Sequence, residues 1–151
     1  MKTFLMLLVF SIFFVGCSSK NGFSRFNLNP EQEIAADSIL SSKVKKGEDV
    51  NGIVSVVYLN KVYPDVFKEK EVFYVYYYLK NPKKTSYLLN KQEATYITEL
   101  DENNDFAYLT SIKTKWNKYY LVEFKKQGDK LKFKFNNGDF SSDTLIFEKD
   151  E

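Results

Sequence analysis

Regular alternation of apolar and charged residues is clearest near the end of the chain. In the segment "KLKFKF" at residues 130–135, every second residue is Leu or Phe and the residues between them are Lys. Because successive side chains of a β-strand point to opposite faces, this spacing predicts a strand with one apolar face toward a core and lysines toward solvent. Outward lysines would also protect a sheet edge from pairing with other chains.

Runs of β-branched and aromatic residues, separated by turn residues, extend the β pattern over the C-terminal two-thirds of the chain. Strands are predicted within residues 52–60, 71–80, 86–90, 94–100, 106–113, 118–126, 130–136 and 143–150. The "QGD" segment between the sixth and seventh of these predicts a hairpin. About seven or eight short strands in some 100 residues are typical of an immunoglobulin-like antiparallel β-sandwich, expected here over residues 50–151.

The segment "EVFYVYYYLK" at residues 71–80 carries apolar side chains on both faces, which predicts a central strand. One face is formed by Phe73, Val75, Tyr77 and Leu79, and the other by Val72, Tyr74, Tyr76 and Tyr78. The tyrosine face would line the layer between two sheets or lie beneath an N-terminal helix. If it were exposed, it would form an apolar patch large enough to mark a binding surface.

A short helix is predicted over residues 29–46. Asn29 suits the position that caps the first turn, Pro30 suits the first helical position, and the acidic residues that follow suit the positive end of the helix dipole. The lysines before Gly47 suit the opposite end. This helix would either pack on the β domain or extend the tether that precedes it.

Residues 1–16 have the order and length of a secretory signal peptide. Lys2 is followed by an apolar run over residues 4–15, interrupted only by Ser11, and by the small residue Gly16. A membrane-spanning helix needs about 20 apolar residues, so this run is too short to remain in a membrane as a span. A buried core helix is the alternative, but the run has no amphipathic spacing.

The single cysteine of the chain, Cys17, ends the motif "FVGC" at residues 14–17, which resembles the lipobox of bacterial lipoproteins. Phe14 departs from the Leu that is commonest at its position. The resemblance implies cleavage before Cys17, a diacylglyceryl thioether on its sulfur and acylation of its new amino group, and several acyl chains together hold a protein stably in a membrane. Residues 17–28 would then be the lipidated cysteine and a flexible polar tether.

The same resemblance bears on location, because Ser18 rather than Asp follows the cysteine. This implies the outer membrane of the cell envelope in preference to the inner one. The alternatives are an ordinary secreted protein with a leftover thiol and a cytosolic protein with an unusual apolar start.

The whole chain, including "TKWNKYYLVEF" at residues 114–124, is similar to small bacterial lipoproteins that carry one immunoglobulin-like domain behind a lipid tether. The cystine pair of antibody domains is absent, so the likeness is one of architecture.

Composition narrows the chemistry that is available. The chain has no histidine, which excludes Ser/His and Cys/His catalysis and most catalytic zinc sites. Lys and Arg number 22 against 20 Asp and Glu, so no strong field favours nucleic acid as a partner. The acidic residues, Glu69, Glu71 and Glu123 among them, lie mostly in predicted turns or on lysine-rich faces, and no pair stands out for acid–base chemistry. We therefore expect no catalytic residues and no cofactor beyond a covalent lipid on Cys17.

The acidic segment "DENND" at residues 101–105 spaces its oxygens like the first half of an EF-hand calcium loop. The rest of the loop does not fit, because Phe106 takes the position of the required glycine and Ile112 that of the bidentate glutamate. A solvated turn is the simpler interpretation, and no metal site is predicted.

The segment "KTKWNKYY" at residues 113–120 combines three lysines with three aromatic residues. Trp116 would either cover the core or anchor a partner or glycan, since Trp and Tyr are favoured contacts in interfaces. The candidate partner-binding residues are Trp116, Tyr119, Tyr74, Tyr76 and Tyr78. The expected function is non-catalytic protein binding or envelope assembly at the membrane, for example by offering a sheet edge to a partner strand. The alternative is a small-ligand or glycan receptor that uses exposed aromatic residues.

Overall fold

The computed structural model describes residues 29–149, and β-strands dominate them. The helical segments are α2 (Pro30–Ser38), α3 (Leu59–Val62) and the 3-10 turn η2 (Ala107–Leu109). The strands are β1 (Ile39–Lys46), β2 (Asp49–Tyr58), β3 (Lys70–Leu79), β4 (Thr85–Leu89), β5 (Gln92–Glu93), β6 (Tyr96–Leu100), β7 (Lys118–Lys125), β8 (Lys130–Asn137), β9 (Phe140–Ser141) and β10 (Leu145–Glu148). The prediction of a mainly β protein is confirmed.

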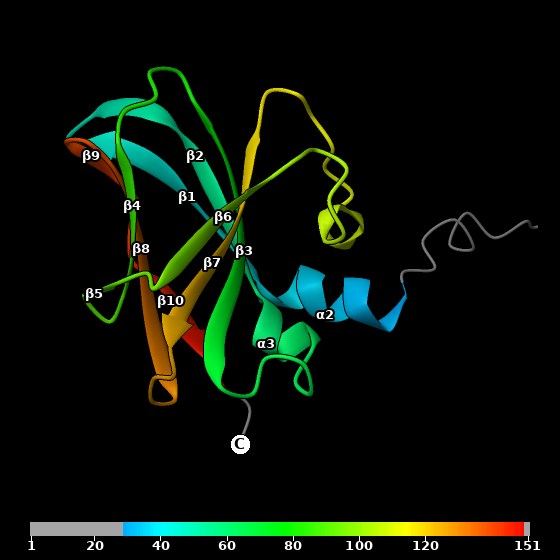
Figure 1. The fold of residues 1–151 in the computed structure, drawn as a ribbon. Helices are drawn as coiled ribbons and strands as arrows, with labels where there is room; N and C mark the ends of the chain where they lie inside the picture. Colours follow the sequence, from blue (N-terminus) through cyan, green and yellow to red (C-terminus); the bar gives the residue numbers. More distant parts are fainter. Residues whose placement is uncertain (1–28, 150–151) are drawn as a thin grey trace, which may run out of the picture.

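The strands of the described residues form one antiparallel sheet (Figure 1). The order across it is β5-β4-β8-β9-β1-β2-β3-β7-β6, and β10 also pairs with β8. The sheet curls into a half-barrel, so that β4 and β8 form one wall and β3 and β7 the other (Figure 1). The expected immunoglobulin-like sandwich of two separate sheets does not form, because one continuous sheet curls around its own core.

A bulge and a glycine allow this curl near the β1–β2 hairpin. The register of β1 against β2 shifts between Val44 and Lys45, beside Gly52. A Cβ atom on Gly52 would lie 2.0 Å from the carbonyl oxygen of Tyr78 on β3, so the two backbones can approach this closely only at a glycine. Because bulges bend and twist the strand that carries them, this region helps a single sheet to close on itself.

Strand β3 lies between β2 and β7, which confirms its predicted central position. Phe73 and Val75, on the concave face, join a core that includes the inward residues of β8, such as Phe133. Tyr74 and Tyr76, on the convex face, belong to a second core. The middle of the sheet is therefore packed on both faces.

The helical segments supply the cover for the convex face. Ala35 of α2, Leu59 of α3 and Leu109 of η2 are buried against the tyrosines there. Figure 1 shows α2 and α3 lying on this side of the sheet. Residues 106–113, predicted as a strand, instead form η2 and its flanking loop. Ala107 and Leu109 of this segment are buried because they cover this face rather than join the sheet.

The start of α2 confirms the predicted cap. The side chain of Asn29 accepts a hydrogen bond from Gln32 N–H (2.8 Å), and the side chain of Gln32 accepts one from Asn29 N–H (3.0 Å). This reciprocal capping box satisfies two backbone donors that a helix end leaves open, and Pro30 follows it in the first turn. The helix ends at Ser38.

The second half of the predicted helix, residues 39–46, is strand β1. Ser42 and Val44 are buried at alternate positions, and the lysines around them are exposed. The strand turns into β2 through Gly47, whose φ of +58° suits a residue without a Cβ atom. Pairing with β2 along the whole segment outweighs the helix propensity of its lysines.

Strands β7 and β8 do not pair, although the "QGD" segment predicts a hairpin between them. β7 lies between β3 and β6, whereas β8 lies between β4 on one side and β9 and β10 on the other. Residues 126–129 cross from one wall of the half-barrel to the other instead of turning back. β8 alternates as predicted, with Leu131, Phe133 and Phe135 buried, but it is an inner strand and its lysines protect no edge.

Candidate functional site

Strand β6 is an exposed edge of the sheet. It stands at one end of the strand order and pairs with β7. Tyr96 and Ile97 are 69% and 50% exposed although their side chains point to opposite faces, and Thr98 and Glu99 are exposed as well. Edges with large apolar side chains invite pairing with another chain, and most monomeric proteins protect against it.

The register shows which backbone groups of β6 lack a neighbour in the sheet. The carbonyl of Glu123 on β7 accepts a hydrogen bond from Thr95 N–H (2.7 Å), so the backbone of Glu123 faces β6. Backbone groups alternate in direction along a strand, so every second residue of β7 bonds to β6. The β6 partners of these residues are Tyr96, Thr98 and Leu100. The N–H and C=O groups of Ile97 and Glu99 therefore point away from β7.

Trp116 lies three residues before Tyr119, the β7 residue that pairs with the C-terminal end of β6. It stands on the loop that leads into β7 and is 79% exposed. Tyr119, which pairs with Leu100 of β6, holds this loop, because its hydroxyl accepts from Thr114 N–H (2.9 Å) and donates to Thr114 O (3.0 Å). Trp116 thus does not cover the core, and its ring faces solvent.

The other candidate tyrosines lie in different surroundings. Tyr74, Tyr76 and Tyr119 are buried together on the convex face, with ring centroids 5.8 to 6.3 Å apart. Burial leaves these rings no direct contact with a partner, so they support the sheet and the Trp116 loop. Tyr78 is 42% exposed on the same strand as Tyr74 and Tyr76.

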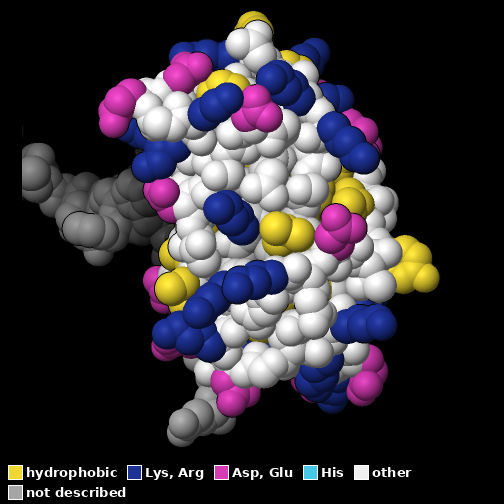
Figure 2. Space-filling view, turned by 90° about the vertical axis from the view of Figure 1, so that its left-hand side faces the viewer, with side chains coloured by type: hydrophobic (Ala, Val, Ile, Leu, Met, Phe, Trp, Pro, Cys, Tyr) yellow, Lys and Arg dark blue, Asp and Glu magenta, His cyan; other side chains and the backbone are white. Residues whose placement is uncertain are grey.

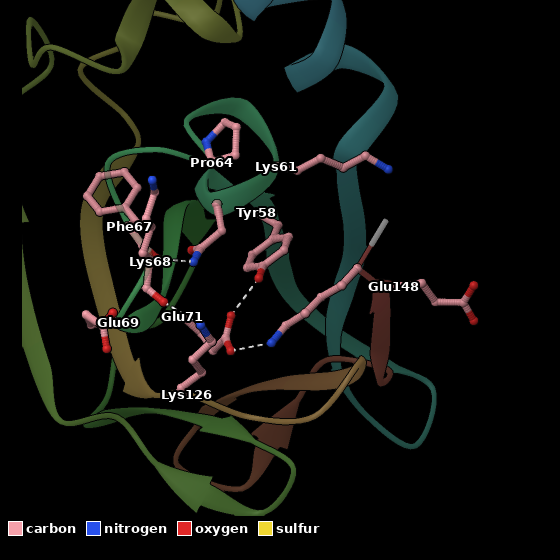
Figure 3. A pocket seen from close by; sticks show the side chains of 11 residues that line it. Tyr58, Lys61, Pro64, Phe67, Lys68, Glu69, Glu71, Lys126 and Glu148 are labelled. Atoms are coloured by element: carbon pink, nitrogen blue, oxygen red, sulfur yellow. Dashed lines mark hydrogen bonds and ion pairs between the residues drawn. The ribbon is translucent and has the colours of Figure 1, made fainter. Parts of the chain in front are cut away.

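A cleft of about 520 Å³ lies at the other end of the half-barrel, between the residues after α3 and the end of the chain (Figure 3). Glu71, which is only 1% exposed, lies at its inner end. The Tyr58 hydroxyl donates to one oxygen of Glu71 (2.5 Å), while Lys149 Nζ (2.7 Å) and Gln127 N–H (2.9 Å) donate to the other. The interpretation of Glu71 as a turn or outward-facing acid is therefore wrong.

The electrostatics of this cluster do not favour catalysis. Burial alone would raise the pKa of Glu71, but the hydrogen bonds from Gln127, Lys149 and Tyr58 outweigh it and hold the pKa below its usual value. Burial, together with the hydrogen bond to Glu71, raises the pKa of Tyr58 well above its usual value. At neutral pH the carboxylate is ionised and paired and the phenol is protonated, which leaves neither free as a base or nucleophile. The other two Glu side chains of the lining point away from Glu71 (Figure 3).

The described residues hold neither a metal-binding cluster nor a helix that crosses a membrane. Among residues 29–149, no group of three or more His, Cys, Asp or Glu side chains is arranged to hold a metal ion. No helix in the described part of the chain is long and apolar enough to cross a membrane. Cys17 and the predicted signal peptide and tether lie outside the described residues, so lipidation stays a prediction.

Two features were not predicted from the sequence: which strand forms an edge of the sheet, and the hydrogen-bonded cluster around Glu71. A half-buried strand alternates large apolar residues with polar ones, whereas Tyr96 and Ile97 in "YITEL" are adjacent. This pattern is a weak indication that the strand is not half-buried. Glu71 stands at the head of an apolar run, but its partners come from three distant segments.

No protein-family model, curated protein or solved structure matches this chain significantly. Its function must therefore be inferred from the arrangement of its own residues.

Proposed function

We propose that this chain is a lipid-anchored bacterial envelope protein without catalytic activity, which binds a partner protein by pairing β6 with a strand of that partner. The lipid on Cys17 would hold it at the membrane, with the outer membrane favoured. The observation that carries the binding proposal is the β6 edge: the backbone groups of Ile97 and Glu99 point away from the sheet beside the exposed side chain of Tyr96.

The backbone of an edge strand is suited to pair with another extended segment. A row of N–H and C=O groups is complemented by another extended segment, and side chains flanking the row give specificity. Ile97 and Tyr96 offer apolar contacts on opposite faces of β6, and Trp116, in the loop that leads into the neighbouring strand β7, adds a large exposed ring. Trp and Tyr carry much of the binding energy in many interfaces.

Crosslinking in the native envelope tests the partner site. A photoreactive phenylalanine analogue replaces Tyr96 in the anchored chain, and the expected result is a discrete crosslinked protein. Ile97→Pro in the same chain should abolish that product, because proline removes a donor that points toward the partner while leaving the β6–β7 pairing intact. The same analogue at Tyr78, an exposed tyrosine of β3, is the matched control. Equal products from both positions, or a product unaffected by Ile97→Pro, would contradict strand pairing at β6.

Trp116→Ala distinguishes the protein-binding proposal from the alternative, a glycan or small-ligand receptor. The receptor alternative is favoured by one observation, the exposed ring of Trp116. If Trp116→Ala abolishes binding of a soluble envelope glycan fraction, and Ile97→Pro does not, the receptor function replaces strand pairing.

Lipidation is tested separately, by metabolic labelling with a clickable fatty acid. We expect label on the native chain and none on Cys17→Ser. Label that persists on Cys17→Ser would rule out the anchor.

A further inference from the structure

The outer face of β8 carries a row of lysines that the proposed partner site does not use. Lys130, Lys132 and Lys134 occupy alternate positions, about 6.8 Å apart along the strand. The neighbouring strands place Leu88 of β4 opposite Lys134 and Ile146 of β10 opposite Lys132, and the one acidic neighbour across β10 is Glu148, opposite Lys130. Figure 2 shows the side of the molecule that carries β4 and β8, where a band of basic side chains crosses the lower half.

These lysines surround a hollow of about 660 Å³. The lining residues are Leu88, Asn90, Lys91, Lys130, Lys132, Lys134 and Thr144. The lining therefore contains four ammonium groups and no carboxylate. Lys130 lies 3.9 Å from Glu148, at the limit of an ion pair, and within residues 29–149 no acidic side chain pairs with Lys91, Lys132 or Lys134.

The fourth lysine is held in place by an unfavourable turn. Asn90 and Lys91 connect β4 to β5, and both have positive φ values, of 49° and 69°. The Asn90 side chain fixes this turn on β8, because it donates to Lys130 O (3.2 Å) and accepts from Lys132 N–H (3.0 Å). Glycine is the favoured residue at the second position of such a turn. Lysine there adds backbone strain and brings one more positive charge beside three others, and such local costs are typical of functional positions.

We propose that this lysine-lined hollow docks on the anionic headgroups of a membrane surface. Lysine is a compact charge that binds phosphate without demanding a fixed geometry, and basic residues near an anionic bilayer add to binding one by one. The apolar stems and Leu88 would lie against the less polar part of the headgroup layer. The inference rests on the anchoring part of the proposed function, which supplies the nearby membrane, and not on the partner strand.

The predicted tether is long enough for this orientation. Residues 17–28 span at most about 40 Å when extended, whereas a folded domain of this size has a radius of gyration of about 14 Å. A compact domain with this radius of gyration is about 36 Å across, so a lipid at Cys17 permits the β8 face to reach the bilayer when the tether is nearly fully extended.

Vesicle binding tests the proposal with the whole mature chain, carrying Cys17→Ser so that no lipid contributes. We expect co-sedimentation with vesicles of phosphatidylcholine and phosphatidylglycerol, and none with phosphatidylcholine alone. The double variant K132E/K134E should lower the affinity about tenfold or more. The control K113E/K115E changes the charge equally on the Trp116 loop, and it should bind nearly as well as the parent chain. Equal losses in both variants, or binding that ignores phosphatidylglycerol, would overturn the proposal.

Two further measurements complete the test. Inorganic phosphate at constant ionic strength should not displace the chain from vesicles; displacement would show a small-anion site in place of membrane docking.

Lys91→Gly should raise the midpoint of thermal unfolding and lower vesicle affinity together, because it relieves the backbone strain of the turn and removes one charge. A rise in the midpoint with unchanged affinity would exclude Lys91 from the site. Because the chain in these assays has no lipid, their failure leaves the fatty-acid labelling result at Cys17 unaffected.

Discussion

At the scale of single residues, Glu71 joins three parts of the chain that are far apart in sequence. Its carboxylate binds the end of β2 through Tyr58, the β7–β8 connection through Gln127 and the end of the chain through Lys149. A buried charge whose partners are removed is costly, because the interior cannot replace the lost hydration. The cluster therefore acts as a structural clamp on the end of the half-barrel.

Glu71→Gln should lower the free energy of unfolding by about 2–3 kcal/mol at neutral pH, since hydrogen bonds to a charged group contribute about that much. The pKa of Glu71 is lower in the folded chain than in the unfolded one. Its stabilisation is therefore present above the unfolded pKa and is lost as pH falls through the folded pKa. Urea unfolding across this range should show the difference between the two proteins shrinking in acid.

The neighbouring exposed residue Glu148 provides the control for this experiment. Its side chain is 76% exposed and 3.9 Å from Lys130, so Glu148→Gln should leave stability unchanged at every pH. A pH dependence that is the same in Glu71→Gln and in the native chain would show that Glu71 contributes nothing to acid unfolding.

Gly52→Ala should destabilise the fold by about 1–3 kcal/mol or more, because the added Cβ atom would meet the backbone of Tyr78 on β3. Gly128→Ala is the matched control, since nothing lies within 4 Å of a Cβ atom there. Thermal unfolding of both variants measures the effect. Equal midpoints would mean that β2 and β3 separate at this point without cost.

At the scale of elements, predictions succeed where a local pattern and the tertiary environment agree. The cap at Asn29, the two apolar faces of β3 and the alternation of β8 are local signals, and all three appear in the structure. Residues 39–46 and 106–113 differ, because the first segment pairs with the strand that follows it and the second covers a distant face. Lysines favour a helix until β2 pairs with the first segment, and the second becomes cover for the convex tyrosines.

The strand β6 allows a direct test of which backbone groups face outward. Ile97→Pro should change stability by less than about 1 kcal/mol, because its N–H points away from β7. Thr98→Pro should cost more, about 1–3 kcal/mol, because it removes a bond of the β6–β7 ladder and leaves its acceptor on β7 unpaired. Chemical denaturation of the two variants compares them at adjacent positions of one strand. The reverse order would mean that the N–H group of Ile97, and not that of Thr98, points toward β7.

At the scale of the whole molecule, the β class and the positions of most of the longer strands follow from the sequence, whereas the closure of the sheet does not. A sandwich and a half-barrel have the same alternating strands and differ in whether the sheet is continuous. That depends on the bulge at Val44 and Lys45, on the close approach at Gly52 and on the crossing of residues 126–129. The candidate site shares this limit, because β6 becomes an edge only through the strand order.

The long stretch of sequence that the clamp spans has a consequence for biosynthesis. β10 adds Leu145 and Phe147 to the concave core, and Lys149 reaches Glu71 across 78 positions of sequence. The concave core is thus completed only after residues 145–149 have been synthesised, and contacts between such distant segments make folding slow. Until those residues emerge, the segment before them can still be threaded as an extended chain, which is what export guided by the predicted signal peptide would require.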